Sequence, residues 1–266
     1  MKKILVVHNF YRNFGGEDSN IHDEIQFLQN DYQVKFFQAK NKDRFVFFPL
    51  LALITRSNFK KNSEFKKVIN EFEPSIVYIH NTWFNINLGI FNILKKNNIK
   101  TIVKIHNFRY DCARYFFAKN HLKGKKRCDA CSFEAKKGLI LNKYFESSYI
   151  KSLLLYFYSL KYFKILINFP IKIIAINKFH KLQLTKLGIT KDKVEVINNP
   201  LDLESYQSTI KKNNIIYAGR LSREKGLVEL IEAWVAANMD DYTLLIIGEG
   251  ELSNELRDKY TQNNIK

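Results

Sequence analysis

The sequence predicts an α/β fold built around parallel sheets. Short apolar runs of strand length alternate with segments whose apolar residues recur at helical spacing. This alternation is typical of a doubly wound sheet that carries helices on both faces. It stops near residue 200 and resumes at residue 215. We therefore expect a Rossmann-like N-terminal domain over residues 1–199, a linker over 200–214 and the start of a second Rossmann-like domain over 215–266.

The elements of the N-terminal domain follow from its apolar runs and helical periodicity. The runs predict strands at Ile4–Val7, Val34–Phe37, Ile76–Ile79, Thr101–Ile105, Ile171–Ile176 and Val194–Ile197. The periodic segments predict a helix that begins near Glu17 and runs through Ile21, Ile25 and Leu28, and further helices at Phe59–Phe72, Ile86–Leu94, Leu139–Phe169 and Lys178–Leu187. A polar and basic insertion, residues 107–138, interrupts the alternation and contains all three cysteines.

The second domain begins with a strand, Ile215–Ala218, and a helix that follows Gly226. Arg220, Arg223 and Lys225 lie between these two elements. The N-terminus of a helix presents free N–H groups and a positive dipole end, so a basic strand-to-helix turn is suited to binding phosphate. The alternative is a solvated basic loop. A second strand, Thr243–Ile247, and a helix, Leu252–Tyr260, complete the chain.

The composition is strongly basic, with a net charge of +17, and predicts a polyanionic neighbour. The charge is spread along the chain and no nucleic-acid-binding motif is present, which favours an anionic membrane surface over a nucleic acid. No secretion signal is recognisable, and no segment has the ~20 apolar residues of a spanning helix. We expect a cytoplasmic protein, peripheral at the inner face of the membrane, with reduced cysteines.

Six segments resemble one enzyme family. Residues 219–226 read GRLSREKG, which resembles the GR-L-x-x-x-KG signature that opens the second domain of family 4 glycosyltransferases, enzymes of the GT-B fold. Residues 8–18, HNFYRNFGGED, resemble the glycine-rich first loop of that family, and residues 103–112, VKIHNFRYDC, resemble its HNYR-x-x-C element. Residues 126–131 read KRCDAC and resemble the later paired cysteines of that family. Residues 173–202 and 244–256 resemble the segments before the interdomain turn and after the next strand. The matches occur in family order.

This resemblance implies a retaining, hexosyltransferase-type enzyme that moves a sugar from a UDP- or GDP-linked donor to a saccharide or lipid-linked acceptor in cell-surface polysaccharide synthesis. Arg220 and Lys225 would hold the donor diphosphate, so catalysis would require no cofactor. Gly15, Gly16 and Glu17 would form the loop near donor and acceptor. The alternatives are an inactive glycosyltransferase-like scaffold that needs a partner, and a basic nucleic-acid-binding protein.

Two further residues follow the fourth strand, at the edge where open α/β sheets place ligands. His106 is assigned a polar contact to the transferred sugar, with a structural role as the alternative. Arg109 is a possible contact for an acceptor phosphate, and a solvated arginine is equally consistent with the sequence.

The cysteines form a C-x15-C-x2-C pattern at Cys112, Cys128 and Cys131, with His121 between them. Three thiolates and one imidazole could complete a tetrahedral structural zinc site, although the spacing is not that of a standard zinc finger. A cluster of reduced thiols is the alternative.

The segment Leu139–Phe169 combines lysines with many aromatic residues. This combination suits a helix that lies at an anionic interface, and equally a core helix with one wet face.

The second domain is short. A complete GT-B domain needs roughly five or six strand–helix units, or ~150 residues, whereas two strands and two helices follow residue 214. The family's E-x7-E element has no place after Gly250. We therefore expect a C-terminally truncated enzyme, with little transferase activity on its own.

Overall fold

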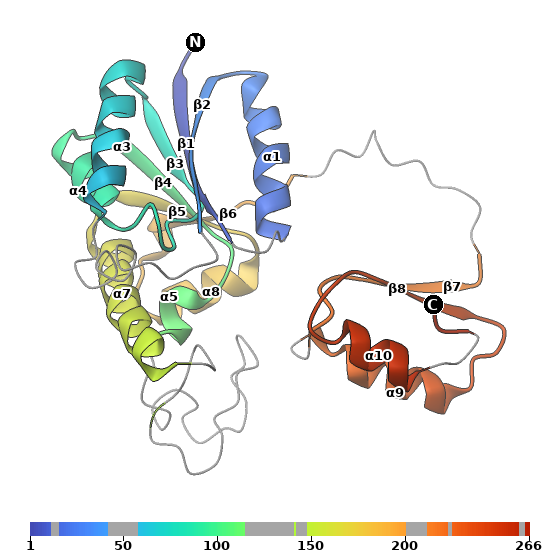
Figure 1. Cartoon of the computed structure of the whole chain (residues 1–266). Helices are drawn as coiled ribbons and strands as arrows, with labels where there is room; N and C mark the ends of the chain where they lie inside the picture. Colours follow the sequence, from blue (N-terminus) through green and yellow to red (C-terminus); the bar gives the residue numbers. More distant parts are fainter. Residues whose placement is uncertain are drawn as a thin grey trace. The chain divides into compact units, whose positions relative to one another are not determined.

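The computed structural model of the protein describes residues 1–11, 16–41, 58–114, 141, 148–200, 212–222, 225–260 and 264–266 (Figure 1). The chain separates into two compact units, Met1–Asp202 and Leu203–Lys266. The boundary between them lies inside the predicted linker.

The first unit is built on a parallel six-stranded sheet with the order β2-β1-β3-β4-β5-β6. The chain leaves β1 for β2 on one side and returns to place β3 on the other side, so the winding direction switches between β1 and β3. Open α/β sheets bind ligands beyond the carboxyl ends of the strands at such a switch point. The strands are β1 Lys3–Phe10, β2 Gln33–Lys40, β3 Ile76–Ile79, β4 Lys100–Ile105, β5 Ile171–Ala175 and β6 Val194–Val196.

Helices cover both faces of this sheet because successive strand residues point to opposite sides. Ile4 and Val6 pack with Ile21 on the face covered by α1, whereas Leu5 and Val7 belong to the larger core beneath the other helices. Figure 1 shows α1 on one side of the sheet and α3 and α4 on the other. The helices are α1 Gly16–Gln29, α3 Phe59–Phe72, α4 Gly89–Lys96, α5 Arg109–Cys112, α7 Tyr149–Asn168 and α8 Lys178–Lys186, with a short 3-10 helix at Lys191–Lys193.

Side-chain caps explain where several helices begin. The side chain of Asn58 accepts a hydrogen bond from the backbone N–H of Lys61 (3.2 Å) at the start of α3. Ser148 caps α7 in the same way, so this helix starts ten residues later than predicted, and Leu141 lies outside it. α4 starts at Gly89, three residues later than predicted, because Asn87 adopts a left-handed conformation with φ of 69°.

The second unit pairs β7 (Asn214–Ala218) with β8 (Thr243–Ile247) in parallel. Its helices are α9 (Leu227–Ala237) and α10 (Ser253–Lys259). The helices and the strands share one core, formed by Leu221, Leu227, Ile231, Trp234, Leu244, Leu252 and Leu256. Two strand residues remain largely exposed, Ile216 at 60% and Ile247 at 56%. Among the described residues of the whole chain, no helix is long and apolar enough to cross a membrane.

Candidate functional site

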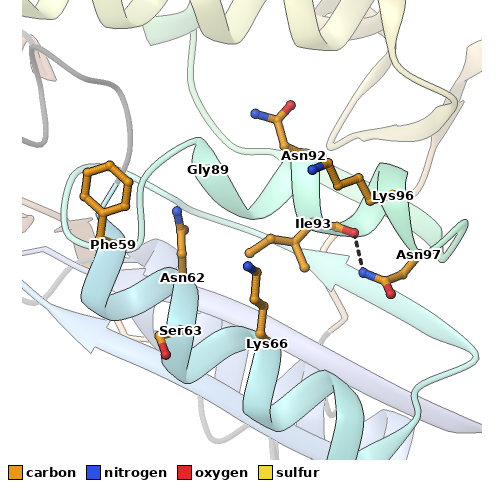
Figure 2. Close-up of a pocket in the computed structure, with 9 residues that line it drawn as sticks. All are labelled: Phe59, Asn62, Ser63, Lys66, Gly89, Asn92, Ile93, Lys96 and Asn97. Atoms are coloured by element: carbon orange, nitrogen blue, oxygen red, sulfur yellow. Dashed lines mark hydrogen bonds between the residues drawn. The ribbon is translucent and has the colours of Figure 1, made fainter.

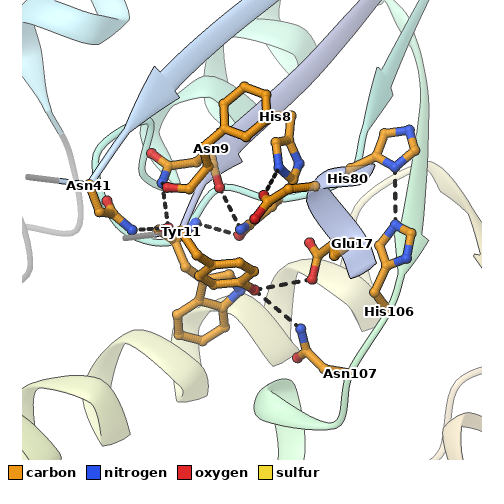
Figure 3. A network of polar contacts seen from close by, with 12 residues as sticks. His8, Asn9, Tyr11, Glu17, Asn41, His80, His106 and Asn107 are labelled. Atoms are coloured by element: carbon orange, nitrogen blue, oxygen red, sulfur yellow. Dashed lines mark hydrogen bonds and ion pairs between the residues drawn. The ribbon is translucent and has the colours of Figure 1, made fainter. Parts of the chain in front are cut away.

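The first candidate site lies at the switch point of the six-stranded sheet. β1, β3 and β4 end there, and each is followed by polar residues. The resulting cluster contains Tyr11, Glu17, His80, His106 and Asn107 (Figure 3), together with Arg109, which contacts Tyr11. The sequence predicted Glu17, His106 and Arg109 as site residues, and the structure brings all three to this edge. Of the predicted glycines, Gly16 opens α1, and Gly15 lies outside the described residues.

The Tyr11 hydroxyl connects the segments that follow β1 and β4. It donates a hydrogen bond to Glu17 Oε2 (3.2 Å) and accepts hydrogen bonds from Asn107 Nδ2 (3.4 Å) and an Arg109 guanidinium nitrogen (3.2 Å). The Arg109 guanidinium also lies 5.0 Å from the ring centre of Tyr11 and 5.4 Å from that of Trp83. Arg109 is therefore half-buried and held by aromatic and polar contacts.

Glu17 has a shifted proton affinity in this cluster. Burial raises the pKa of its carboxyl group from 4.5 to about 7, and the Arg109 charge and the Tyr11 hydrogen bond oppose the rise. Close to neutral pH the group therefore exchanges between the acid and the carboxylate, as a proton-transfer group requires.

This shift predicts a pH dependence of stability. Between about pH 4.5 and about 7 the folded protein retains a proton on Glu17 that the unfolded chain has lost, so the free energy of unfolding should fall as the pH rises through this range. Glu17→Gln should remove this contribution. Denaturant unfolding at several pH values measures both proteins, and parallel pH profiles for wild type and variant would contradict the assignment.

The two histidines at the ends of β3 and β4 form a hydrogen-bonded pair. His80 Nδ1 lies 3.0 Å from His106 Nε2. Burial, the nearby Lys104 charge and His8 lower the pKa of His106 to about 3. Burial likewise lowers the pKa of His80 well below its usual value. Both rings are therefore neutral at pH 7, and His106 acts as a hydrogen-bonding group rather than as a cation.

Below the histidine pair lies a buried charged network. Lys104 is fully buried in β4, and its ammonium group lies 2.9 Å from Glu24 Oε2 on α1. The Tyr78 hydroxyl donates a hydrogen bond to the other oxygen of Glu24 (2.6 Å), and burial raises the Tyr78 pKa. The sequence analysis missed Tyr11, Glu24, His80 and Lys104. His80 follows a predicted strand, as His106 does, so the same criterion could have selected it.

The second candidate site lies at the carboxyl end of the β7–β8 sheet. Arg220 follows β7, and Lys225 precedes Gly226, which caps α9 in a left-handed conformation without a side-chain hydrogen bond. Both basic residues are exposed. The first N–H groups of α9 thus have no side-chain cap, as an anion site at a helix N-terminus requires. Arg223 lies outside the described residues.

Glycines let the two strand ends of this site come close together. The Gly219 N–H donates to the Ile247 carbonyl (3.0 Å). A Cβ atom on Gly248 would lie 1.9 Å from the Gly219 carbonyl oxygen, and φ of Gly248 is 149°. Only glycine fits there, which keeps the edge next to Arg220 free of bulky side chains.

The predicted zinc ligands lie mostly outside the described residues. Cys112 ends α5 and is half-buried, whereas His121, Cys128 and Cys131 fall in a range that the structure does not describe. Within the described ranges, no group of three or more His, Cys, Asp or Glu side chains could hold a metal ion.

Comparisons with known proteins agree with this architecture. Residues 200–266 match the family model "Glycosyl transferases group 1". The whole chain aligns with 68% of Anabaena HepE, with 15% identity and a TM-score of 0.52 for the complex with UDP and glucose, and 13% and 0.54 for the complex with UDP-glucose. These similarities confirm the predicted α/β fold class of GT-B type. No curated protein matches the sequence.

Proposed function

We propose that the chain acts in the transfer of a sugar from a nucleoside-diphosphate donor to an acceptor. The observation that carries this proposal is the position of Arg220 and Lys225 at the uncapped N-terminus of α9, inside the segment that matches the glycosyltransferase model. The HepE complexes hold UDP, glucose or UDP-glucose, which supports a uridine nucleotide as the first donor to test.

The leaving diphosphate accumulates negative charge as the bond between the sugar and the diphosphate oxygen breaks. Arg220, Lys225 and the α9 N-terminus would stabilise this charge electrostatically, which makes a metal ion unnecessary. The first unit would bind the sugar and the acceptor. Neutral His106 would contact the transferred sugar, and Arg109 would contact an acceptor phosphate. Gly15, Gly16 and Glu17 would form the loop near donor and acceptor. The family resemblance adds three points to the proposal. The sugar would be a hexose, it would be transferred with retention of configuration, and the product would belong to cell-surface polysaccharide synthesis.

Nucleotide binding by the purified chain tests this function. UDP or GDP should raise the melting temperature, and the rise should grow with the logarithm of its concentration above Kd. If nucleotide binds but no transfer or donor hydrolysis occurs with any acceptor, the scaffold alternative is favoured. If no nucleotide binds and an oligonucleotide binds in a salt-sensitive manner, the protein is a basic nucleic-acid-binding protein and the proposal fails.

We also place the chain at an anionic membrane surface, on the basis of α7. One face of this helix is in the core, with Tyr158 and Tyr162 buried. Along the opposite face the side chains of Ile150 (70% exposed), Leu153 and Phe157 (46% exposed) are spaced by three and four residues, followed by the exposed Lys164. An exposed apolar stripe that ends beside an exposed lysine suits insertion at the headgroup level of anionic lipids.

A second basic surface lies between α3 and α4. Between the two helices lies a pocket of about 340 Å³ (Figure 2). Phe59 and Lys66 of α3 and Lys96 of α4 are part of its lining. Its two ammonium groups suit anionic headgroups.

The α7 stripe gives a membrane-binding prediction. Ile150→Ser/Leu153→Ser/Phe157→Ser should weaken binding to phosphatidylglycerol vesicles by about tenfold or more, since a fully buried apolar side chain contributes about 1.5 kcal/mol or more. Co-sedimentation measures this. Phe27→Ser removes an even more exposed aromatic side chain (62%) from α1 and should leave binding unchanged. Equal binding by wild type and triple variant would refute the assignment of α7.

A further inference from the structure

His80 lies between the buried Glu24 carboxylate and the candidate site. Its side chain is fully buried. On one side, its Nδ1 is hydrogen-bonded to His106 Nε2 (3.0 Å). On the other side, its Nε2 lies 3.7 Å from Glu24 Oε2, which also forms the ion pair with Lys104. The path from Glu24 through His80 to His106 therefore runs from the buried network to the carboxyl edge of the sheet. Figure 3 shows the His80–His106 part of this path.

The positions of the protons in this path follow from electrostatics. A neutral imidazole has one N–H donor and one acceptor nitrogen. If the proton of His80 were on Nδ1, the lone pair of its buried Nε2 would face the negatively charged oxygen of Glu24. With the proton on Nε2, the N–H dipole points toward the carboxylate, which is favourable in a site of low dielectric constant. Nδ1 of His80 is then the acceptor in the pair.

This arrangement determines the role of the second ring. Because Nδ1 of His80 accepts, Nε2 of His106 must donate, and the proton of His106 is on Nε2. His106 is half-buried, and its Nδ1 makes no hydrogen bond to any described residue. This nitrogen is thus a preformed hydrogen-bond acceptor at the sheet edge.

We infer that His80, supported by Glu24, is a positioning residue that holds His106 in the Nε2–H tautomer, so that Nδ1 of His106 selects a hydrogen-bond donor on the ligand. On the proposed function, on which this part rests, that donor is a hydroxyl or amide N–H group of the sugar. A carboxylate, as in a uronic acid, has no proton to offer and would meet a lone pair. Low pKa values of both histidines are consistent with this inference, since only neutral rings have defined tautomers.

Nitrogen NMR of the full chain, selectively 15N-labelled in histidine, tests the tautomer directly. Protonated and unprotonated ring nitrogens have well-separated shifts, and His80→Phe and His106→Phe assign the two spin systems among the six histidines. The expected result is a protonated Nε2 and an unprotonated Nδ1 in both rings at pH 7. A protonated Nδ1 in His106, or averaged shifts, would overturn the inference, whatever the protein catalyses.

Two variants test how the tautomer is set. His80→Phe should leave His106 as a mixture of tautomers. Glu24→Gln/Lys104→Met removes both charges while keeping side chains of similar size, and it should produce the same mixture. His22→Gln changes an exposed histidine of α1 and should have no effect. An unchanged His106 tautomer in folded His80→Phe protein would rule out the positioning role.

Transfer kinetics then test the consequence for the ligand. In protein that transfers sugar, His80→Phe should lower kcat/KM by about tenfold, equivalent to one hydrogen bond, while UDP affinity remains unchanged. A hexose donor should be preferred over the matching uronic acid donor, and His106→Phe should abolish that preference. If wild type used both donors equally, Nδ1 of His106 would not select the ligand, although the tautomer could still be as inferred. Absence of transfer would count against the proposed function and would leave the NMR result unaffected.

Discussion

Lys104→Met is expected to destabilise the first unit by about 3–5 kcal/mol. The substitution removes the ammonium group that lies 2.9 Å from Glu24 Oε2. It leaves a buried carboxylate whose remaining neighbours, the Tyr78 hydroxyl (2.6 Å) and His80 Nε2 (3.7 Å), carry no full positive charge. Removing one member of a buried ion pair costs this much because the remaining charge has lost its water and its counterion together.

Urea unfolding monitored by tryptophan fluorescence measures this loss. Trp83 reports on the first unit, and a Trp234→Phe background removes the other of the two tryptophans. Lys100→Met makes the same chemical change at an exposed position of β4 and should change the free energy of unfolding by about 0.5 kcal/mol or less. Glu24→Gln/Lys104→Met should recover most of the loss. A single variant as stable as the Lys100→Met control would show that the pair contributes little.

Arg220→Ala and Lys225→Ala are each expected to weaken UDP binding by about ten- to a hundredfold. A charge-assisted hydrogen bond to phosphate contributes about 1.5–3 kcal/mol. Both side chains are exposed, so the fold should survive either substitution, which circular dichroism can verify.

Isothermal titration with UDP and GDP measures the affinities. Arg257→Ala removes an exposed positive charge from α10 of the same unit and should leave UDP affinity within about twofold of wild type if long-range charge contributes little. If neither Arg220→Ala nor Lys225→Ala changes the affinity of protein that binds nucleotide, the diphosphate assignment is wrong.

Local patterns predicted the elements of the fold well. The bounds of α3, β3 and β8 are those expected from the sequence, because apolar periodicity reports which side of each element is buried. Helix starts were less accurate: the α4 start depends on the left-handed backbone at Asn87, and the α7 start depends on the Ser148 cap. Both are properties of single residues that periodicity does not detect.

The candidate site was predictable only in part, because its contacts join residues that are far apart in the sequence. Lys104 pairs with Glu24 across 80 positions, and Tyr11 contacts Asn107 across 96. Strand ends and a basic turn can be located from local sequence, which is why His106, Arg220 and Lys225 could be proposed. The partner of a buried charge depends on strand order and register, and neither can be derived from the sequence of one strand.

The Tyr11 hydroxyl gives the first candidate site a proton linkage. The positive charge of Arg109 opposes the rise that burial causes in the pKa of Glu17. Both side chains contact the same hydroxyl group. An anionic ligand bound to Arg109 would neutralise part of that positive charge and bring its own negative charge close to Glu17. Both changes would raise the pKa of Glu17 further. Glu17 would then take up a proton as the ligand binds. Association at neutral pH would therefore draw protons from the buffer, and its measured heat would contain the ionisation enthalpy of that buffer.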